Sequence, residues 1–344
     1  MMKIAYMGFG KSAKRYHIPY VLEREMLQIK TVFTPNYTKA DMDEYQQYGI
    51  SFTKNIMDVL EDTEIELVSI CTPPASHFSL AKQCLEYGHN VLVEKPFCET
   101  VAEAKILFDL AKAKGLKIMA YQNRRFDGDF ILLQQILKEG QLGRIVEVET
   151  HFDYYRPEFV AEFSKNPFNG ALYGLGVHSL DQMVALFGKP EKVFYDIKAQ
   201  KGTPSNDDYF EVQLFYADNL KVIVKTSHLV CLPGAKITVH GVQGSFQKTG
   251  MDKQERDLKN NIFPGMAAFG ADDISDYGKL SQNDENSVEV IKTPIGDYGA
   301  IYDNIYQAIR TDALKIVSDE QTLTVLGIIE QGFKQPSPVI VEYK

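Results

Sequence analysis

The first 121 residues alternate short apolar runs with longer segments of helical periodicity, and this alternation constrains the fold more than any other feature. Four apolar runs have the length of buried strands: Lys3–Met7, Glu66–Cys71, Asn90–Val93 and Lys117–Tyr121. The segments between them carry helix signals, among them an N-cap candidate at Ser76 and a capping-box sequence that begins at Thr100. Strands alternating with helices predict a parallel sheet that binds ligands beyond the carboxyl ends of its strands.

The pattern changes after residue 121. Six segments are typical of strands but lack regular helices between them: Ile145–Tyr155, Val193–Ala199, Tyr209–Tyr216, Lys221–Leu229, Lys236–His240 and Val288–Thr293. Helices are expected over Val177–Phe187, Asp303–Ile309 and Glu320–Phe333, and an irregular excursion over Thr249–Asn286. We therefore predict an α/β domain over residues 1–121 and an α+β domain over residues 122–344. The second domain is expected to contain a large, mostly antiparallel open sheet with one half-polar face.

The sequence Gly8-Phe9-Gly10-Lys11-Ser12-Ala13 follows the first strand directly and opens the first helix. In this G-x-G-x-x-A pattern the first glycine makes a tight turn, and the second lets the backbone approach a pyrophosphate. The helix N-terminus adds amide donors for the phosphates. We expect Lys11 and Ser12 to contact the cofactor together with the two glycines. The context predicts a Rossmann dinucleotide-binding domain.

The end of the second strand predicts which dinucleotide binds. NAD-specific sites carry Asp or Glu there, about 20 residues past the glycine motif. Here the run Lys30–Asn36 contains no carboxylate, so a 2′-phosphate meets no like charge. Thr34 and Asn36 offer hydrogen bonds and Lys39 offers a charge, although Pro35-Asn36 is also an ordinary turn sequence. We predict NADP as the preferred cofactor, with NAD as the alternative.

Glu94-Lys95-Pro96 follows another strand on the predicted binding edge. Proline disfavours the helical conformation at Lys95, and a lysine directed into the cleft stabilises charge on a substrate oxygen. Taken alone, Lys95 is more simply a solvated surface lysine.

Composition limits the partners. The chain has 37 basic and 46 acidic side chains and a formal charge of −9, which argues against nucleic acid and anionic membranes. No apolar run approaches the roughly 20 residues of a membrane span. The four cysteines form no C-x-x-C pair and the histidines show no metal-ligand spacing, so we expect no metal and a reduced, cytoplasmic setting.

Four motifs occur together and in order: Gly8-x-Gly10, Cys71-Thr72-Pro73, Glu94-Lys95-Pro96 and Gly176-Val177-His178-Ser179-Leu180-Asp181. With them the whole chain resembles the glucose–fructose oxidoreductase / inositol dehydrogenase / rhizopine catabolism (Gfo/Idh/MocA) family, in particular a bacterial subgroup of oxidoreductases. The resemblance implies an NAD(P)-dependent enzyme acting on sugars, polyols and related compounds. It also implies a homodimer or homotetramer built through the open sheet.

The resemblance assigns the catalytic roles. Lys95 matches the family's catalytic lysine, and His178 matches the histidine that acts as acid/base or binds substrate. One position departs from the family: Gly174 stands where an aspartate often lies, four residues before the histidine. Asp181, Asp153 or Tyr173 can replace that carboxylate, or Lys95 can carry the proton while His178 only holds a hydroxyl.

The remaining expectations concern contacts with cofactor and substrate. Besides the glycine loop and Thr34, cofactor contacts are expected from Thr72, Pro73, His77, Glu94, Lys95 and Gln122. Substrate contacts are expected from Asn123, Tyr154, Arg156, His178 and Asp181. Arg124 and Arg125 are expected to pair with carboxylates rather than with an anionic substrate.

Three functions fit these residues. The first is hydride transfer between nicotinamide C4 and a carbinol or carbonyl carbon of a sugar or inositol-like polyol. The second is a regulatory protein that binds a dinucleotide without catalysis, favoured by Gly174. The third is the NAD-dependent glycoside hydrolysis of rare family members.

Overall fold

The computed structural model describes residues 1–158, 167–202, 205–283, 287–334 and 337–343, and the chain divides into two compact units. The first unit contains residues 1–123, 254–269 and 297–323, and the second contains residues 124–253, 270–296 and 324–344. The first boundary lies two residues after the expected one. The second unit is not the continuous range 122–344, however, because two later segments return to the first unit. No helix of the described residues is long and apolar enough to cross a membrane.

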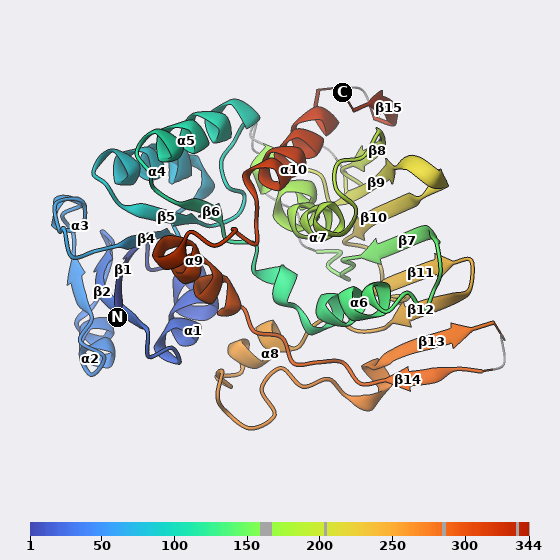
Figure 1. Ribbon diagram of the computed structural model, residues 1–344, viewed down its shortest axis with the longest axis horizontal. Helices are drawn as coiled ribbons and strands as arrows, with labels where there is room; N and C mark the ends of the chain where they lie inside the picture. Colours follow the sequence, from blue (N-terminus) through green and yellow to red (C-terminus); the bar gives the residue numbers. More distant parts are fainter. Residues whose placement is uncertain (159–166, 203–204, 284–286, 335–336, 344) are drawn as a thin grey trace. The chain divides into compact units, whose positions relative to one another are not determined.

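The first unit contains a six-stranded parallel sheet in the order β3-β2-β1-β4-β5-β6 (Figure 1). Its strands are β1 (Met2–Met7), β2 (Leu27–Phe33), β3 (Ser51–Thr53), β4 (Leu67–Ile70), β5 (Asn90–Val93) and β6 (Ile118–Ala120). This is the Rossmann strand order. Strands β2 and β3 are added on one side of β1, and the strands from β4 to β6 are added on its other side, so the order of addition changes between β1 and β4. The sequence-based prediction of the fold class is confirmed for this unit.

Helices cover both faces of this sheet because its side chains alternate. Tyr6 of β1 lies with its hydroxyl 2.9 Å from that of Tyr302 in α9 (Ala300–Thr311). The next residue, Met7, points the other way, and its sulfur lies 3.7 Å from that of Cys84 in α4 (His77–Glu86). The unit's other helices are α1 (Ile18–Leu22), α2 (Lys39–Gln46), α3 (Met57–Leu60), α5 (Val101–Ala113) and α8 (Gln254–Lys259).

The two expected helix caps have different outcomes. Thr100 accepts a hydrogen bond from the Glu103 amide at 3.1 Å, and Glu103 accepts one from the Thr100 amide at 3.2 Å, so the predicted capping box is confirmed. Ser76 is the N-cap residue of α4 as predicted, but its side chain makes no capping hydrogen bond. Its hydroxyl donates to the Thr72 hydroxyl at 2.7 Å and to the Pro73 carbonyl at 2.8 Å, behind the helix start.

The second unit contains a nine-stranded sheet in the order β14-β13-β12-β11-β7-β10-β9-β8-β15. Its strands are β7 (Ile145–His151), β8 (Lys192–Lys198), β9 (Tyr209–Phe215), β10 (Lys221–Ser227), β11 (Ile237–Gly241), β12 (Gly244–Lys248), β13 (Gly278–Gln282), β14 (Glu289–Ile291) and β15 (Val339–Glu342). Strands β7 and β10 pair in parallel, and the other described pairs are antiparallel. The mostly antiparallel sheet is therefore confirmed.

Two local expectations for the chain after residue 121 were wrong. The strand expected over Ile145–Tyr155 ends at His151, and Tyr155 makes only an isolated bridge to Leu229. The supposedly irregular stretch Thr249–Asn286 contains α8 and β13. Both elements are short and rich in polar residues, so neither shows a clear apolar period.

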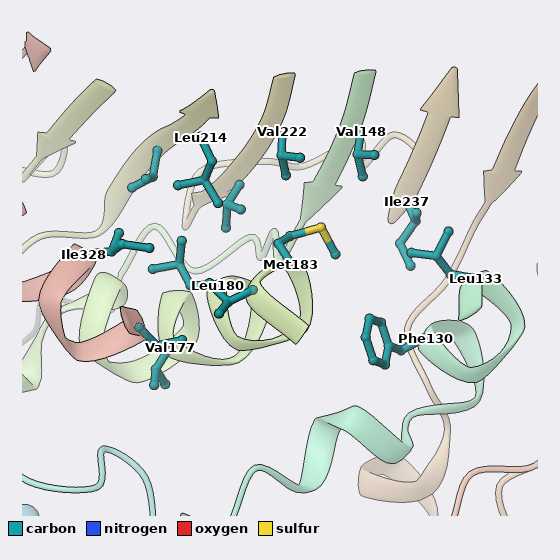
Figure 2. Packing of buried hydrophobic residues seen from close by; sticks show 14 of the residues in the cluster. Phe130, Leu133, Val148, Val177, Leu180, Met183, Leu214, Val222, Ile237 and Ile328 are labelled. Atoms are coloured by element: carbon teal, nitrogen blue, oxygen red, sulfur yellow. The ribbon is translucent and has the colours of Figure 1, made fainter. Parts of the chain in front are cut away.

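Three helices pack on one face of the nine-stranded sheet: α6 (Gly128–Lys138), α7 (Val177–Phe187) and α10 (Asp319–Gly332). Figure 2 shows Leu180 and Met183 of α7 facing the strand residues Leu214, Val222 and Val148. Burying each such side chain contributes roughly 1.5–3 kcal/mol. This packing fixes α7, and it thereby fixes His178 at the start of that helix.

Candidate active site

The two glycines of the loop at the end of β1 have different surroundings. Gly8 has a φ of +100°, and a Cβ there would lie 2.7 Å from the Cys71 carbonyl oxygen, so only glycine fits. At Gly10 a Cβ would meet nothing within 4 Å. The loop is thus closely packed at its first glycine and open at its second, as backbone approach to a phosphate requires.

The residues after the loop begin as a π-helical turn, Ala13–His17, which continues into α1. The Ser12 hydroxyl donates to the Glu94 carboxylate. Lys11 is exposed and lines a cavity of about 710 Å³ together with Lys14 and Arg15. Three cations therefore lie at or just beyond the predicted phosphate loop.

The turn after β2 offers no free carboxylate to a ribose. Thr34 is buried, and its hydroxyl lies 3.4 Å from the Asn36 amide nitrogen, so its side chain folds onto the turn. The first carboxylate after β2 is Asp41, which forms a capping box with Thr38 at the start of α2. Lys14 lies 2.6 Å from Asp41, and their hydrogen bond, aided by those from Thr38, lowers the pKa of Asp41 to about 2.

Glu94 is a buried carboxylate at the end of β5. One oxygen accepts the Lys95 backbone N–H at 2.9 Å, and the other lies 3.0 Å from His17 Nε2 and accepts the Ser12 hydroxyl. Burial alone would raise the pKa of Glu94, but its hydrogen bond to His17 and the charges of His17 and Lys95 lower it to about 2. Glu94 is thus an anion that joins the glycine loop to the turn carrying half-buried Lys95.

Two other predicted cofactor residues, His77 and Gln122, are both buried but differ in their hydrogen bonding. His77 is completely buried, and its ring nitrogens lie 2.8 Å from the Pro96 and Thr72 carbonyl oxygens. It therefore links two turns, beside Thr72 and Pro73, rather than presenting a polar group to a ligand. Gln122 at the end of β6 is 3% exposed, and its buried amide oxygen has no hydrogen-bond partner among the described residues.

In the second unit, His178 is the second residue of α7 and follows a π-helical turn, Leu172–Gly176. It is 6% exposed. Asp181 lies one turn further and does not present its carboxylate to a substrate as predicted. Arg125 donates from Nε at 2.6 Å to one of its oxygens and from Nη2 at 2.7 Å to the other. The expectation that Arg125 pairs with a carboxylate is confirmed by this buried bidentate contact.

The other candidates for orienting His178 are also engaged elsewhere. Asp153 accepts the Ser227 backbone N–H at 2.9 Å and lies 3.0 Å from His151 Nδ1. Tyr173 is part of the hydrophobic core. At Gly174 a Cβ would meet nothing within 4 Å, and this residue lines a cavity of about 150 Å³ in the second unit.

The remaining predicted substrate residues show mixed surroundings. The Arg156 guanidinium lies 3.8 Å from the centre of the Tyr154 ring, and Arg156 lines the same cavity as Gly174. Asn123 is buried at the start of a 3₁₀ turn. Arg124 pairs with Asp127 at 3.3 Å, so its expected pairing is confirmed as well.

Sequence reasoning missed several buried polar groups. His17 contacts both Glu94 and Tyr302, and Tyr302 lies 285 residues after His17 in the chain. In the second unit the Lys236 ammonium lies 3.9 Å from the centre of the Phe152 ring, and burial lowers its pKa against the opposing charge of Asp129. No local sequence pattern marks these residues, since each contact joins segments far apart in the chain.

The first unit fits a dinucleotide. The open position at Gly10, the cations after the loop and the unpaired Gln122 oxygen lie at the carboxyl ends of one parallel sheet, on both sides of its reversal point. The residues that would hold the cofactor are the glycine loop for the pyrophosphate and Gln122 for a ring substituent. Among the described residues no cluster of three or more His, Cys, Asp or Glu is arranged to hold a metal.

Fold and site together define a two-unit dinucleotide-binding oxidoreductase. The chain belongs to the Gfo/Idh/MocA oxidoreductase family, because it matches that family's NAD-binding Rossmann-fold domain over residues 2–122 and its C-terminal α/β domain over residues 134–338.

Two relatives are similar to it over nearly their full lengths. It is 48% identical to the uncharacterized oxidoreductase YhhX of Escherichia coli, with 99% of both chains covered. It is 30% identical to the scyllo-inositol 2-dehydrogenase (NADP(+)) IolW of Bacillus subtilis, which covers 99% of this chain and 96% of the relative. The crystal structure of an oxidoreductase from Bacillus cereus superposes with a TM-score of 0.97 at 42% identity, covering 100% of this chain and 99% of that one.

Proposed function

We propose that the protein is an NADP-preferring dehydrogenase or reductase that interconverts a carbinol and a carbonyl on a sugar or inositol-like polyol. The observation that carries this proposal is the edge of the parallel sheet, where open Gly10, the unpaired Gln122 oxygen and the Glu94–Lys95 turn occur together. The name of the Bacillus subtilis relative, which specifies an inositol and NADP, supports the substrate class and the cofactor.

When bound, the nicotinamide supplies or accepts the hydride at C4. Oxidation of an alcohol removes a hydride from carbon and a proton from oxygen. We assign Lys95 to the substrate oxygen, where its ammonium stabilises the alkoxide charge that forms as the proton leaves and that the hydride transfer then removes. We assign His178 to take up the hydroxyl proton, since an imidazole titrates near neutral pH. In the reductive direction His178 returns that proton to the alkoxide oxygen.

The preference for NADP rests on charge. The turn after β2 has no carboxylate before Asp41, and Asp41 is already bound by Thr38 and Lys14. Lys11 and Arg15 add positive charge nearby. A 2′-phosphate therefore meets cations and hydroxyls rather than a repelling anion.

Calorimetric titration with NADP⁺ and NAD⁺ tests the cofactor, and absorbance at 340 nm with a panel of inositols and aldoses then tests the reaction. We expect tighter binding of NADP⁺ and a change in absorbance with at least one polyol. Failure of both dinucleotides to bind would refute the proposal.

One observation favours a catalytically silent binding protein as the second candidate. Asp181 is held by Arg125 and position 174 is glycine, so neither position offers a carboxylate to orient His178. Tight binding of NADP⁺ without turnover of any panel member would support this alternative.

We propose in addition that the protein is a cytoplasmic homodimer or homotetramer assembled through the open face of the nine-stranded sheet. That face carries partly exposed charged pairs, such as Lys221 with Glu147 at 3.6 Å and Lys225 with Glu211 at 3.4 Å. The free thiols of Cys71, Cys84 and Cys98 suit a reducing compartment.

A further inference from the structure

A buried chain of hydrogen bonds in the first unit connects α9 to the predicted cofactor edge. The Tyr302 hydroxyl of α9 lies 2.9 Å from the Tyr6 hydroxyl, 2.9 Å from the Ser69 hydroxyl and 2.6 Å from His17 Nδ1. The other ring nitrogen of His17, Nε2, lies 3.0 Å from a Glu94 carboxylate oxygen. The links between these residues join β1, β4, β5, α9 and the π-helical turn after the glycine loop.

Counting donors and acceptors fixes the proton at one end of this chain. Because the Glu94 carboxylate can only accept, the proton between it and His17 belongs to Nε2. The Tyr302 hydroxyl, which contacts Nδ1, Tyr6 and Ser69, can donate to one of these groups and accept from the others.

The chain ends on the two segments that form the predicted cofactor site. Glu94 also accepts the backbone N–H of Lys95 at 2.9 Å and the hydroxyl of Ser12. The His17 ring stacks on Tyr121, with 3.8 Å between the ring centres, so the ring cannot turn away from Glu94 without losing this contact. Anchoring His17 therefore fixes Glu94, and Glu94 fixes both the glycine loop and the lysine turn.

We propose that His17 and Tyr302 are positioning residues for dinucleotide binding: they hold the Glu94 carboxylate so that the Ser12 loop and the Lys95 turn keep the spacing the cofactor needs. This inference rests on the proposed function. It explains why the segment 297–323, which brings Tyr302, returns to the first unit. It also explains why an ionised carboxylate is buried here, since such a group is costly unless hydrogen bonds surround it.

The binding test uses three variants and two matched controls. His17→Leu removes the donor to Glu94, and NADP⁺ binding is expected to weaken by roughly tenfold to a hundredfold. His17→Gln keeps an N–H donor and recovers most of that affinity. Tyr302→Phe removes the hydroxyl that contacts Nδ1, Tyr6 and Ser69 but leaves the contact of His17 with Glu94, and the expected loss is about threefold to tenfold.

The controls are buried residues of the same unit outside the chain. His89→Leu removes a buried ring whose nitrogens lie 2.9 Å from the Ile65 and Leu60 carbonyl oxygens. Tyr20→Phe removes a buried hydroxyl bonded to Gln254 at 2.9 Å. Both controls are expected to lower the melting temperature, as the test variants do, while binding NADP⁺ like the wild type. If His17→Leu and Tyr302→Phe also bind like the wild type, the positioning role is refuted.

The free protein gives a second readout that needs no variant. With ¹⁵N-labelled histidine, long-range nitrogen–proton NMR spectra report which ring nitrogen of His17 carries the proton. We expect a protonated Nε2 at pH 7, and an unprotonated Nε2 would overturn the chain. If the wild type binds neither NADP⁺ nor NAD⁺, the proposed function fails; if the wild type binds and the His17 variants bind equally well, this inference alone fails.

Discussion

Replacing Gly8 and Gly10 separately by alanine should give opposite results, although the two residues share one loop. At Gly8 the new methyl group would lie 2.7 Å from the Cys71 carbonyl oxygen, which belongs to the backbone and cannot rotate away. The φ of +100° adds strain, which for an L-residue is roughly 1–2 kcal/mol. Overpacking adds roughly 1–3 kcal/mol. The free energy of unfolding should therefore fall by roughly 2–5 kcal/mol.

At Gly10 the same methyl group meets no protein atom within 4 Å. The free energy of unfolding should stay the same or rise by up to about 1 kcal/mol, because alanine restricts the unfolded chain. The methyl group does occupy the space through which a pyrophosphate approaches the backbone. NADP⁺ affinity should then fall by about tenfold or more, which is roughly 1.4 kcal/mol or more.

Thermal unfolding and calorimetric titration of the wild type and both variants measure these effects. For a chain of this size the Gly8→Ala melting temperature should drop by roughly 3–7 °C, whereas Gly10→Ala should melt close to the wild type. The reasoning would be refuted by a Gly8→Ala protein of unchanged stability. It would equally be refuted by a Gly10→Ala protein that binds NADP⁺ like the wild type.

Three further predictions concern the second unit. Asp181→Asn leaves the Arg125 guanidinium buried without its anion, so urea unfolding should show a loss of about 3–5 kcal/mol. Glu342→Gln, at an exposed pair with Lys192, should cost less than about 1 kcal/mol. Burial raises the pKa of Asp207 to about 6, so the native state binds this proton more tightly than the unfolded state. The free energy of unfolding therefore falls as pH rises from about 4 to 6, by up to about 3 kcal/mol. Asp207→Asn should remove this pH dependence. Light scattering should report a dimer or tetramer that Lys225→Glu weakens, and a monomeric wild type would contradict the proposed assembly.

The sequence was most informative where the determinants are local. The strands at β1, β4, β5 and β6 were predicted because each is an apolar run bounded by turn residues. The capping box at Thr100 was predicted because its two partners lie three residues apart. The glycine loop was predicted because both glycines act within a few residues of one strand end.

Features that depend on distant partners were not predictable in this way. No sequence pattern near Asp181 indicates that its partner is Arg125, 56 residues earlier, so Asp181 was predicted to contact the substrate instead. His17 and Tyr302 are single polar residues without local pattern, and only the folded sheet brings them together. Residues 297–323 return to the first unit, and no change in amino-acid composition at this segment predicts that return.

The central claim is that Lys95 stabilises the substrate oxygen during hydride transfer. The most direct test measures single-turnover absorbance at 340 nm for Lys95→Met, with saturating cofactor and an accepted polyol. The matched control is Lys105→Met, which replaces an exposed lysine of α5. We expect Lys95→Met to bind NADP⁺ within about threefold of the wild type and to transfer hydride at least about a hundredfold more slowly, with Lys105→Met unchanged. Hydride transfer by Lys95→Met at the rate of the wild type would contradict the claim.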